Sequence, residues 1–161
     1  MRSIPVVVAT IMMCATTATR PMDTILRGCQ SIMQQYRSGQ TEAFYQRMLQ
    51  IHLYHSGIVC LAEVDVFAMS GAVPVLVGRI DLEVDHSTIL ELKVCNQILP
   101  KHVQQLLRYV RARQATGMNV QHAAVICFTD SNTVIVREED LRLLQPPAKG
   151  VVRSRFFPPP N

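Results

Sequence analysis

The sequence lacks any pair of cysteines at C-x-x-C spacing. Its five cysteines are well separated along the 161 residues, at Cys14, Cys29, Cys60, Cys95 and Cys127. This spacing indicates neither a zinc knuckle nor a disulfide framework. Three of the cysteines lie in apolar runs, where a free thiol behaves as a small hydrophobic side chain. We therefore expect reduced cysteines and a reducing compartment.

Charged residues are also sparse, and no internal repeat is present. They make up 17% of the chain against 48% hydrophobic residues, a balance that is typical of a globular protein and not of a disordered one. The length predicts one domain with a substantial core. The net charge of +4 and the pI of about 9.0 are compatible with a polyanionic partner but do not require one.

Acidic residues are missing from the N-terminus as far as Asp23, and an apolar run extends from Ile4 to Ala15. This pattern is compatible with a signal peptide, a transit peptide, an unstructured extension or a wrongly assigned start. The run is too short and too often interrupted by threonine to span a membrane. We expect an intracellular protein, in the cytoplasm or nucleus. Secretion or organelle import is the less favoured alternative, because the cleavage-site pattern is poor.

The composition predicts three segments. Residues 1–22 form an N-terminal extension or targeting segment, 23–145 a folded domain, and 146–161 a disordered Pro-rich tail. Within the domain, helical and strand periodicities alternate. They predict helices over 24–37 and Thr41–His55, strands Ile58–Ala68, Val73–Asp85 and Thr88–Val94, a helix from Pro100 to Thr116, strands Ala123–Phe128 and Thr133–Val136, and a short helix Glu138–Leu144. This order predicts an α/β fold, with a mixed sheet flanked by helices.

Two of these segments, Gly78–Asp85 and Thr88–Val94, alternate between apolar and charged residues, as strands with one apolar face do. The turn chemistry of Asp85-His86-Ser87 indicates a hairpin. The first strand has an apolar face of Ile80, Leu82 and Val84 and a charged face of Arg79, Asp81 and Glu83. The second has an apolar face of Leu90, Leu92 and Val94 and a charged face of Glu91 and Lys93. Pairing Leu82 with Leu90 or with Leu92 satisfies burial, and either register gathers Asp81, Glu91 and Lys93 on the opposite face.

Two interpretations of these three charged residues remain open at this point. Exposed faces of antiparallel strands are usually polar, so the residues alone favour a solvated face with a surface ion pair. The alternative is a metal site, because Mg²⁺ takes oxygen ligands such as carboxylates. The ammonium group of Lys93 would then orient a nucleophilic water or stabilise developing negative charge.

Further motifs lie on either side of this hairpin. Gly39 to Tyr45 reads GxxExxY, Asp81 with Glu91-Leu92-Lys93 reads D…(D/E)xK, and His102 to Tyr109 reads HxxQLLxY. In this order and spacing, over about residues 24–137, the chain resembles the GxxExxY proteins of the PD-(D/E)XK nuclease superfamily. The resemblance implies a restriction-endonuclease-like core of order α-β-β-β-α-β. The sequence departs from the family pattern at Ile80, where a proline is usual, and at Cys127, where relatives often carry asparagine.

The resemblance also implies roles for individual residues. Asp81 and Glu91 would ligate Mg²⁺, for which Mn²⁺ may substitute, together with the backbone carbonyl of Leu92. Lys93 would orient the attacking water or stabilise the transition state. Glu42 either supports the metal through water or is a first-turn acid favoured by the helix dipole. Tyr45 either supports Glu42 or belongs to the core.

The helix after Pro100 carries the remaining candidates. Gln105 and Tyr109 lie four residues apart and therefore share a helix face. They are either site residues placed over the metal, with His102 beside them, or an ordinary amphipathic boundary. The basic residues of this helix are candidates for phosphate binding: Lys101, His102, Arg108, Arg111 and Arg113.

The function expected from this resemblance is a Mg²⁺-dependent nuclease that acts on DNA. The alternative is a non-catalytic protein of the same fold that binds nucleic acid or a protein partner. The complete set of Asp81, Glu91 and Lys93 favours the nuclease, because a binding module does not need all three. A homodimer would suit double-strand cutting, although nothing in the sequence requires one.

Overall fold

The computed structural model describes residues 21–144. The predicted tail, 146–161, and the predicted extension, 1–22, lie outside the described residues, except for Pro21 and Met22. These two residues open the first helix, and Met22 is buried, so the folded domain begins before the predicted boundary. Within the described range, no helix has the length and apolar character needed to cross a membrane.

The helices and strands follow the predicted order. They are α1 (Pro21–Tyr36), α2 (Glu42–His55), β1 (Cys60–Ser70), β2 (Val73–Val84), β3 (Thr88–Val94), α3 (Pro100–Ala115), β4 (His122–Phe128), β5 (Val134–Glu138) and a 3-10 helix, η1 (Leu141–Leu144). The segment from α2 to β4 confirms the α-β-β-β-α-β order. The main differences from the prediction lie at the ends of elements. Strand β1 begins at Cys60 and not at Ile58, and the last helix is only a 3-10 turn, Leu141–Leu144.

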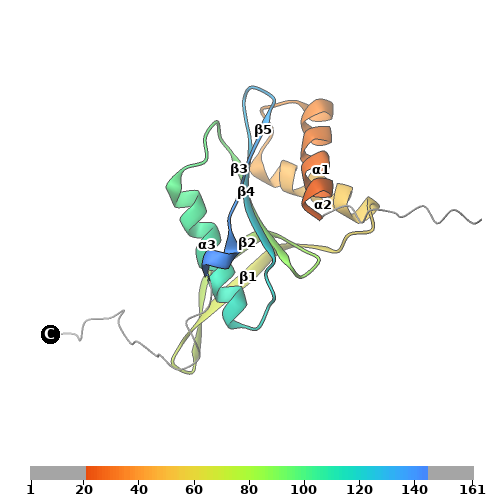
Figure 1. Ribbon diagram of the computed structural model, residues 1–161. Coiled ribbons are helices and arrows are strands. Elements are labelled where there is room, and N and C mark those ends of the chain that lie inside the picture. Colours follow the sequence, from red (N-terminus) through yellow and green to blue (C-terminus); the bar gives the residue numbers. More distant parts are fainter. Residues whose placement is uncertain (1–20, 145–161) are drawn as a thin grey trace, which may run out of the picture.

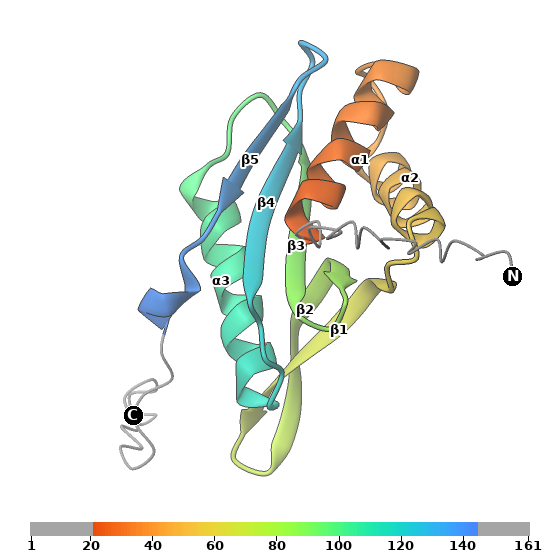
Figure 2. The same cartoon turned by 45° about the vertical axis from the view of Figure 1, so that its right-hand side comes forward.

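The five strands form one mixed sheet in the order β1-β2-β3-β4-β5. Antiparallel pairing joins β1 to β2, β2 to β3 and β4 to β5, whereas β3 and β4 run parallel. Parallel neighbours need a crossover, and α3 provides it. Helices α1 and α2 cover one face of the sheet and α3 covers the other (Figures 1 and 2). The fold class predicted from the sequence, an α/β sandwich with a mixed sheet, is confirmed.

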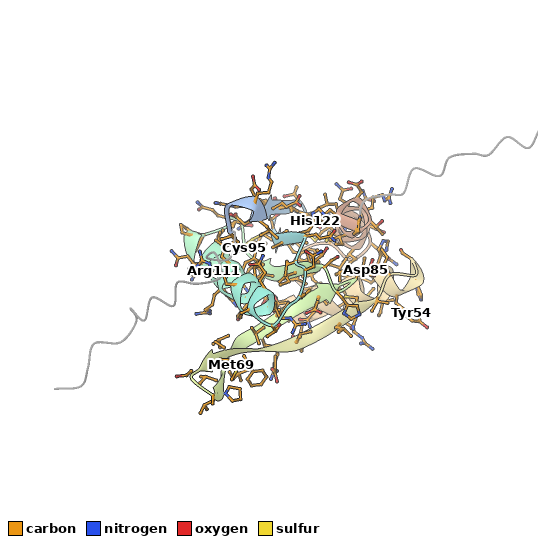
Figure 3. All side chains as sticks on the ribbon, turned by 60° about the horizontal axis from the view of Figure 1, so that its bottom comes forward. Tyr54, Met69, Asp85, Cys95, Arg111 and His122 are labelled. Atoms are coloured by element: carbon orange, nitrogen blue, oxygen red, sulfur yellow. A yellow bond between two sulfur atoms is a disulfide. The ribbon has the colours of Figure 1, made fainter. Side chains whose placement is uncertain are left out.

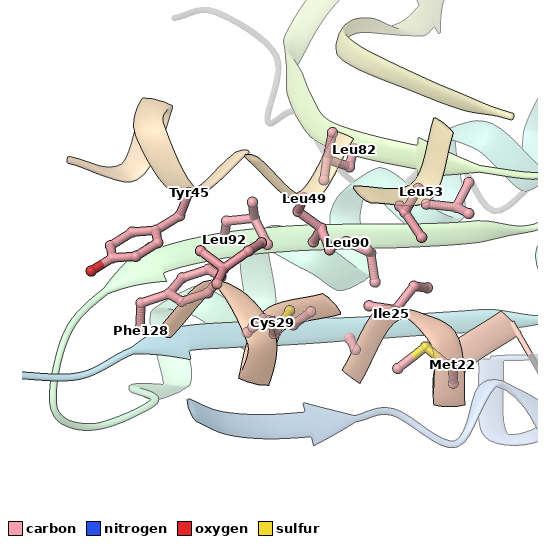
Figure 4. Close-up of a cluster of buried hydrophobic side chains, with 14 of the residues drawn as sticks. Met22, Ile25, Cys29, Tyr45, Leu49, Leu53, Leu82, Leu90, Leu92 and Phe128 are labelled. Atoms are coloured by element: carbon pink, nitrogen blue, oxygen red, sulfur yellow. The ribbon is translucent and has the colours of Figure 1, made fainter. Parts of the chain in front are cut away.

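Each face of the sheet has its own hydrophobic core. On the α1/α2 side, side chains such as Cys29, Tyr45 and Leu49 pack over Leu92 and Phe128 of the sheet (Figure 4). The Tyr45 ring stacks on Phe128 with centroids 4.1 Å apart, and its hydroxyl donates to the carbonyl of Arg37 at 2.9 Å. Tyr45 is therefore a core residue, which was one of its two predicted roles. The core on the α3 side includes Ile89, Val103, Leu106 and Val125.

The β2–β3 hairpin has the first of the two predicted registers. Leu82 pairs with Leu90, and the turn places Asp85 and His86 at positive φ. The alternation predicted for β2 is wrong at one position, because Ile80 packs in the core under α3 whereas Leu82 packs under α1 and α2. The physical reason is that β2 pairs with β3 only over Leu82–Val84. Before Leu82 the strand pairs with β1 alone, and that pairing is interrupted at Asp81, opposite Glu63, which has a φ of +56°. The alternation of side chains therefore changes face at this point.

The interpretation of the charged face as a solvated surface is wrong for two of its residues. Glu83 and Glu91 are each only 1% exposed, because α3 covers this face of the sheet. Ile89 lies on the same face, so the run from Thr88 to Leu92 is buried on both sides. A central strand between two helical layers has no solvated face. The carboxylates on it therefore need partners.

The β1–β2 hairpin extends beyond the sheet as a two-stranded arm. Its tip carries Met69, which is 65% exposed and lies far from the body of the domain (Figure 3). Between Asp65 and Arg79 this arm contains no charged residue. Phe67, Val73, Val75 and Leu76 on the arm are also exposed.

Candidate active site

The candidate site lies where β2 and β3 separate. Pairing between the two strands ends at Leu82 and Leu90, so the next backbone groups of β3 have no partner strand on that side. The Asp81 carboxylate fills this position and accepts a hydrogen bond from the Leu92 amide at 2.7 Å, through Oδ2. The N–H and C=O of one strand residue point the same way. The Leu92 carbonyl is therefore directed toward the same gap as Asp81.

Glu91 faces this gap from β3, and its two carboxylate oxygens differ in their surroundings. Oε1 accepts a hydrogen bond from the Lys93 ammonium at 2.6 Å. Oε2 is buried and has no hydrogen-bond partner within residues 21–144. An unpartnered buried carboxylate oxygen is costly for the folded state. A bound cation is one group that would satisfy it.

Lys93 connects the two carboxylates that flank it. Its Nζ lies 2.6 Å from Glu91 Oε1 and 3.5 Å from Glu42 Oε1, at the start of α2. Thr41 caps that helix by accepting a hydrogen bond from the Phe44 amide at 3.2 Å. The GxxExxY segment therefore brings Glu42 to Lys93. Glu42 is thus an acid in the first turn of α2 and also a direct contact of Lys93.

The protonation equilibria of this cluster reflect its burial. Burial raises the pKa of Asp81 to about 6, against the hydrogen bond from Leu92 and the charge of Lys93, which lower it. Burial, and then repulsion from Asp81, raises the pKa of Glu91 to about 7. For Lys93 burial acts to lower the pKa, but the Glu91 hydrogen bond and the surrounding carboxylates raise it on balance. Two acids with raised pKa values beside a retained ammonium are typical of a functional site.

Gln105 and Tyr109 are brought together on α3, as their spacing predicted. Gln105 Nε2 donates to the Tyr109 hydroxyl at 3.1 Å. The Tyr109 ring also lies against the backbone of Gly78 on β2, where an added Cβ would collide with the hydroxyl. Gly78 has φ +153°, a region that favours glycine. Sequence reasoning gave no role to Gly78, although a glycine inside a strand is a signal of close backbone approach.

The N-terminal half of α3 forms a basic pocket next to Lys93. Its lining residues are Lys93, Lys101, His102, Gln104, Gln105 and Arg108. Lys101 and Arg108 are exposed, and the Arg108 guanidinium lies 5.6 Å from the centroid of the Tyr109 ring. His102 is buried, and its Nδ1 accepts a hydrogen bond from the Leu99 amide at 3.2 Å. Burial, and then the charge of Lys101, lowers the His102 pKa, so the ring is neutral near neutral pH.

Two other basic residues of α3 lie outside this pocket. Arg111 is exposed, farther along the helix. Arg113 points to the sheet and binds the buried carboxylate of Glu83, with Nη2 2.8 Å from Oε2 and Nε 3.1 Å away. A guanidinium held by a buried carboxylate is not available to a phosphate group. We therefore leave Arg113 out of the nucleic-acid surface proposed below.

The expectation of five unpaired cysteines is wrong for one pair. Cys95, just after β3, is disulfide-bonded to Cys127 of β4. Cys127 is the register partner of Lys93 across the parallel pair. The Sγ atoms and a ring nitrogen of His102 lie within 4.8 Å of one another. The spacing of 32 residues gave no signal, because proximity here depends on the parallel register of β3 and β4.

The residues at the gap between β2 and β3 fit a hard divalent cation. Asp81 and Glu91 offer carboxylate oxygens on adjoining strands, and Glu91 Oε2 is buried without a partner among the described residues. The carbonyl of Leu92 adds a third oxygen. Mg²⁺ commonly binds through one or two carboxylates and completes its shell with water and substrate phosphate. The donor set is thus all oxygen, as this ion prefers.

Comparison with known proteins identifies the superfamily of the chain. The model of the PD-(D/E)XK nuclease superfamily matches residues 20–138. Comparisons with curated proteins and with solved structures give no significant match. The narrower assignment to the GxxExxY group stays a prediction. Because the superfamily match spans most of the chain and all the strands of the sheet, this protein belongs to the PD-(D/E)XK nuclease superfamily.

Proposed function

We propose that this protein is a Mg²⁺-dependent nuclease that hydrolyses phosphodiester bonds in DNA. Membership of a nuclease superfamily supports the reaction class. The observation that carries the proposal is Glu91 Oε2, a buried carboxylate oxygen that no other described residue partners, beside Asp81 and Lys93. A purely structural ion pair between Glu91 and Lys93 would not leave this atom unsatisfied in the core.

In this proposal, Asp81, Glu91 and the Leu92 carbonyl hold the divalent cation. When bound, Mg²⁺ or Mn²⁺ supplies Lewis acidity, which polarises a phosphoryl oxygen and acidifies a water molecule. Both carboxylates must be ionised to act as ligands. Their pKa values of about 6 and about 7 make the site ready for a cation near neutral pH and above.

Lys93 provides the fixed positive charge. Its pKa is raised, so it is an ammonium group throughout the working range and acts as a donor, not as a base. Glu91 at 2.6 Å and Glu42 at 3.5 Å fix its position. From there the ammonium orients the nucleophilic water and stabilises the negative charge that builds on the phosphate oxygens.

Helix α3 supplies the groups that position the substrate. Lys101 and Arg108 are exposed at the basic pocket that Lys93 also lines, and Arg111 continues the charged surface. These side chains are proposed to contact backbone phosphates. Gln105 and Tyr109 are proposed to position the scissile phosphate. Phosphate contacts of this kind place the nucleic acid without reading its sequence.

The experiment that tests this function is a cleavage assay on labelled single- and double-stranded DNA and RNA, with Mg²⁺, Mn²⁺ or EDTA. The wild type is compared with Lys93→Ala, and with Lys101→Ala as a variant outside the reacting centre. We expect cleavage of DNA that requires the metal, is lost in Lys93→Ala and is only weakened in Lys101→Ala. Binding of nucleic acid without cleavage under every condition would replace the nuclease with the non-catalytic alternative.

A further inference from the structure

A second group of reactive side chains lies beside the candidate active site. Cys95 follows β3 two residues after Lys93, and Cys127 lies next to Lys93 on β4. The side chain of Cys95 is partly exposed, whereas Cys127 is fully buried. Cys95 lies by α3, on the side of the sheet that this helix covers (Figure 3). Of the two residues, Cys95 is therefore the one that is open to a soluble thiol or disulfide.

The surroundings of this pair favour thiol chemistry. A His102 ring nitrogen lies within 4.8 Å of both sulfur atoms, and Lys93 and Lys101 are close enough to His102 to lower its pKa. Neighbouring cations stabilise a thiolate, which is the reactive form of cysteine. His102 is neutral and its Nδ1 accepts the Leu99 amide, so its other nitrogen carries a proton and is a hydrogen-bond donor.

The other two described cysteines have the opposite character. Burial raises the pKa of Cys29 to about 12. Burial, and then repulsion from Asp85, raises the pKa of Cys60 to about 11. Cys29 is buried and Cys60 is partly exposed, and both are free thiols. Cys60 is therefore an internal control for Cys95, because both residues are partly exposed and burial and Asp85 disfavour the thiolate of Cys60.

The backbone keeps the two sulfur atoms close without the bond between them. The Cys95 amide donates to the Phe128 carbonyl at 3.2 Å. The Asn96 side chain makes two hydrogen bonds of 2.9 Å with Asp130: its Nδ2 donates to the carboxylate, and its Oδ1 accepts from the backbone amide. These contacts join the ends of β3 and β4 around the pair. The disulfide can therefore open and close while the sheet stays intact.

We propose that Cys95 and Cys127 are a reversible dithiol–disulfide pair, with Cys95 as the thiol that attacks low-molecular-weight disulfides and Cys127 as the resolving thiol. The pair links the segment between Lys93 and α3 to β4. The proposal does not rest on the nuclease function, because it concerns only the reactivity of these two thiols.

The reaction with oxidised glutathione balances in two exchange steps. The Cys95 thiolate attacks one sulfur of the glutathione disulfide, which breaks the S–S bond and releases one glutathione thiolate. Cys127, once deprotonated, attacks Cys95 Sγ, forms the Cys95–Cys127 bond seen in the structure and releases the second thiolate. The two protons lost by the protein end on the two glutathione molecules. The protein thiols are oxidised, and glutathione disulfide is reduced.

The test uses the full chain, reduced, freed of reductant and then equilibrated in buffers with different ratios of reduced to oxidised glutathione. After an acid quench and alkylation, peptide mapping by mass spectrometry follows every cysteine. We expect the Cys95–Cys127 cross-link to increase with the oxidised fraction and to reverse when the ratio is restored. In Cys127→Ser we expect Cys95 to accumulate as the mixed disulfide, at least about tenfold faster than Cys60.

Cys127→Ser replaces a buried side chain, so the early time course in the wild type provides a second measurement. Transient glutathione on Cys95, before the cross-link forms, supports the assignment. Equal reactivity of Cys95 and Cys60 in both proteins would overturn it. Stoichiometric zinc that stays on the reduced wild type through dialysis and protects both thiols would also overturn it, because Cys95, Cys127 and His102 would then be a metal site.

Discussion

At the scale of single residues, Glu91 shows how a buried acid can be stable and reactive at once. One carboxylate oxygen is held by Lys93 at 2.6 Å, and the other has no partner in the part of the chain that the structure describes. Burial and the nearby Asp81 make its charged form unfavourable in the absence of a metal. The residue therefore lowers the stability of the metal-free fold at neutral pH and offers a strong ligand to a cation.

This environment predicts a pH dependence of stability. The pKa rises from 3.8 to about 6 for Asp81 and from 4.5 to about 7 for Glu91 on folding. The folded state therefore keeps protons that the unfolded state has lost. The free energy of unfolding that these groups contribute is greatest below their unfolded pKa values and is lost as pH rises through the folded values. We expect urea unfolding in EDTA to show this loss between about pH 4 and pH 7.

The control for that measurement is the double variant Asp81→Asn with Glu91→Gln, which cannot titrate at these positions. Its stability should fall less over the same pH range. Parallel curves for the two proteins would contradict the raised pKa values. Added Mg²⁺ should stabilise the wild type more at the upper end of the range, because the carboxylates must be ionised to bind it.

At the scale of elements, α3 is fixed to the sheet by a buried ion pair. Arg113 near its C-terminus binds Glu83 of β2 with two guanidinium nitrogens. Glu83 is 1% exposed and the Arg113 side chain 26%, so the carboxylate is shielded from solvent. The pair also orients the helix that carries Gln105 and Tyr109.

Removal of the arginine should therefore destabilise the fold more than removal of a surface charge. We expect Arg113→Ala to lower the free energy of unfolding by about 3 kcal/mol, because the buried Glu83 carboxylate is left with only the exposed His86 ring, 3.6 Å away, as a partner. Arg111→Ala, on the exposed side of the same helix, should change it by less than about 0.5 kcal/mol. Equal effects in chemical denaturation would show that Glu83 is not dependent on Arg113.

The close contact between β2 and α3 at Gly78 also predicts a loss of stability on substitution. An alanine there would need a strained φ of +153° and would collide with Tyr109, so we expect a loss of about 3 kcal/mol. Gly71→Ala has a positive φ but open space around it, and should cost about 1 kcal/mol. Thermal or urea unfolding of the two variants measures the difference. A cost for Gly78→Ala no larger than that for Gly71→Ala would contradict the close packing.

Local patterns predicted most of these elements. Strand β3 has the predicted bounds, and the hairpin register was one of two that burial allowed. The resemblance implied that Glu42 supports the metal through water, but it did not specify the contact of Glu42 with Lys93 at 3.5 Å. The face of Ile80, the Arg113–Glu83 pair and the Cys95–Cys127 pair could not be predicted. Each depends on where two strands separate or on the register of the strands joined by the α3 crossover. Hydrophobic periodicity and residue spacing along the chain do not determine either of these.

At the scale of the whole molecule, basic charge gathers on the α3 side of the sheet beside the candidate site. Lys101 and Arg108 line the pocket that reaches Lys93. If they contact phosphates, each contact releases counterions from the nucleic acid. We expect Lys101→Ala and Arg108→Ala each to reduce the slope of log Kd against log salt by about 0.9.

Arg27 provides the control for that titration, because it is exposed on α1, in the opposite helical layer. Arg27→Ala should leave the salt slope unchanged. Fluorescence anisotropy with a short labelled duplex in EDTA measures binding without cleavage. Equal slopes for all the variants would place the nucleic-acid surface elsewhere on the molecule.

The most direct test of the metal site is the cleavage rate of Asp81→Asn in Mg²⁺. The substitution is nearly isosteric and keeps an acceptor for the Leu92 amide, so the fold should be retained, as circular dichroism would verify. Asp65→Asn, at an exposed ion pair with Arg79 on the same hairpin, is the matched control. We predict a loss of at least about 10²-fold for Asp81→Asn and none for Asp65→Asn. Cleavage by Asp81→Asn at the wild-type rate would contradict the assignment of the site.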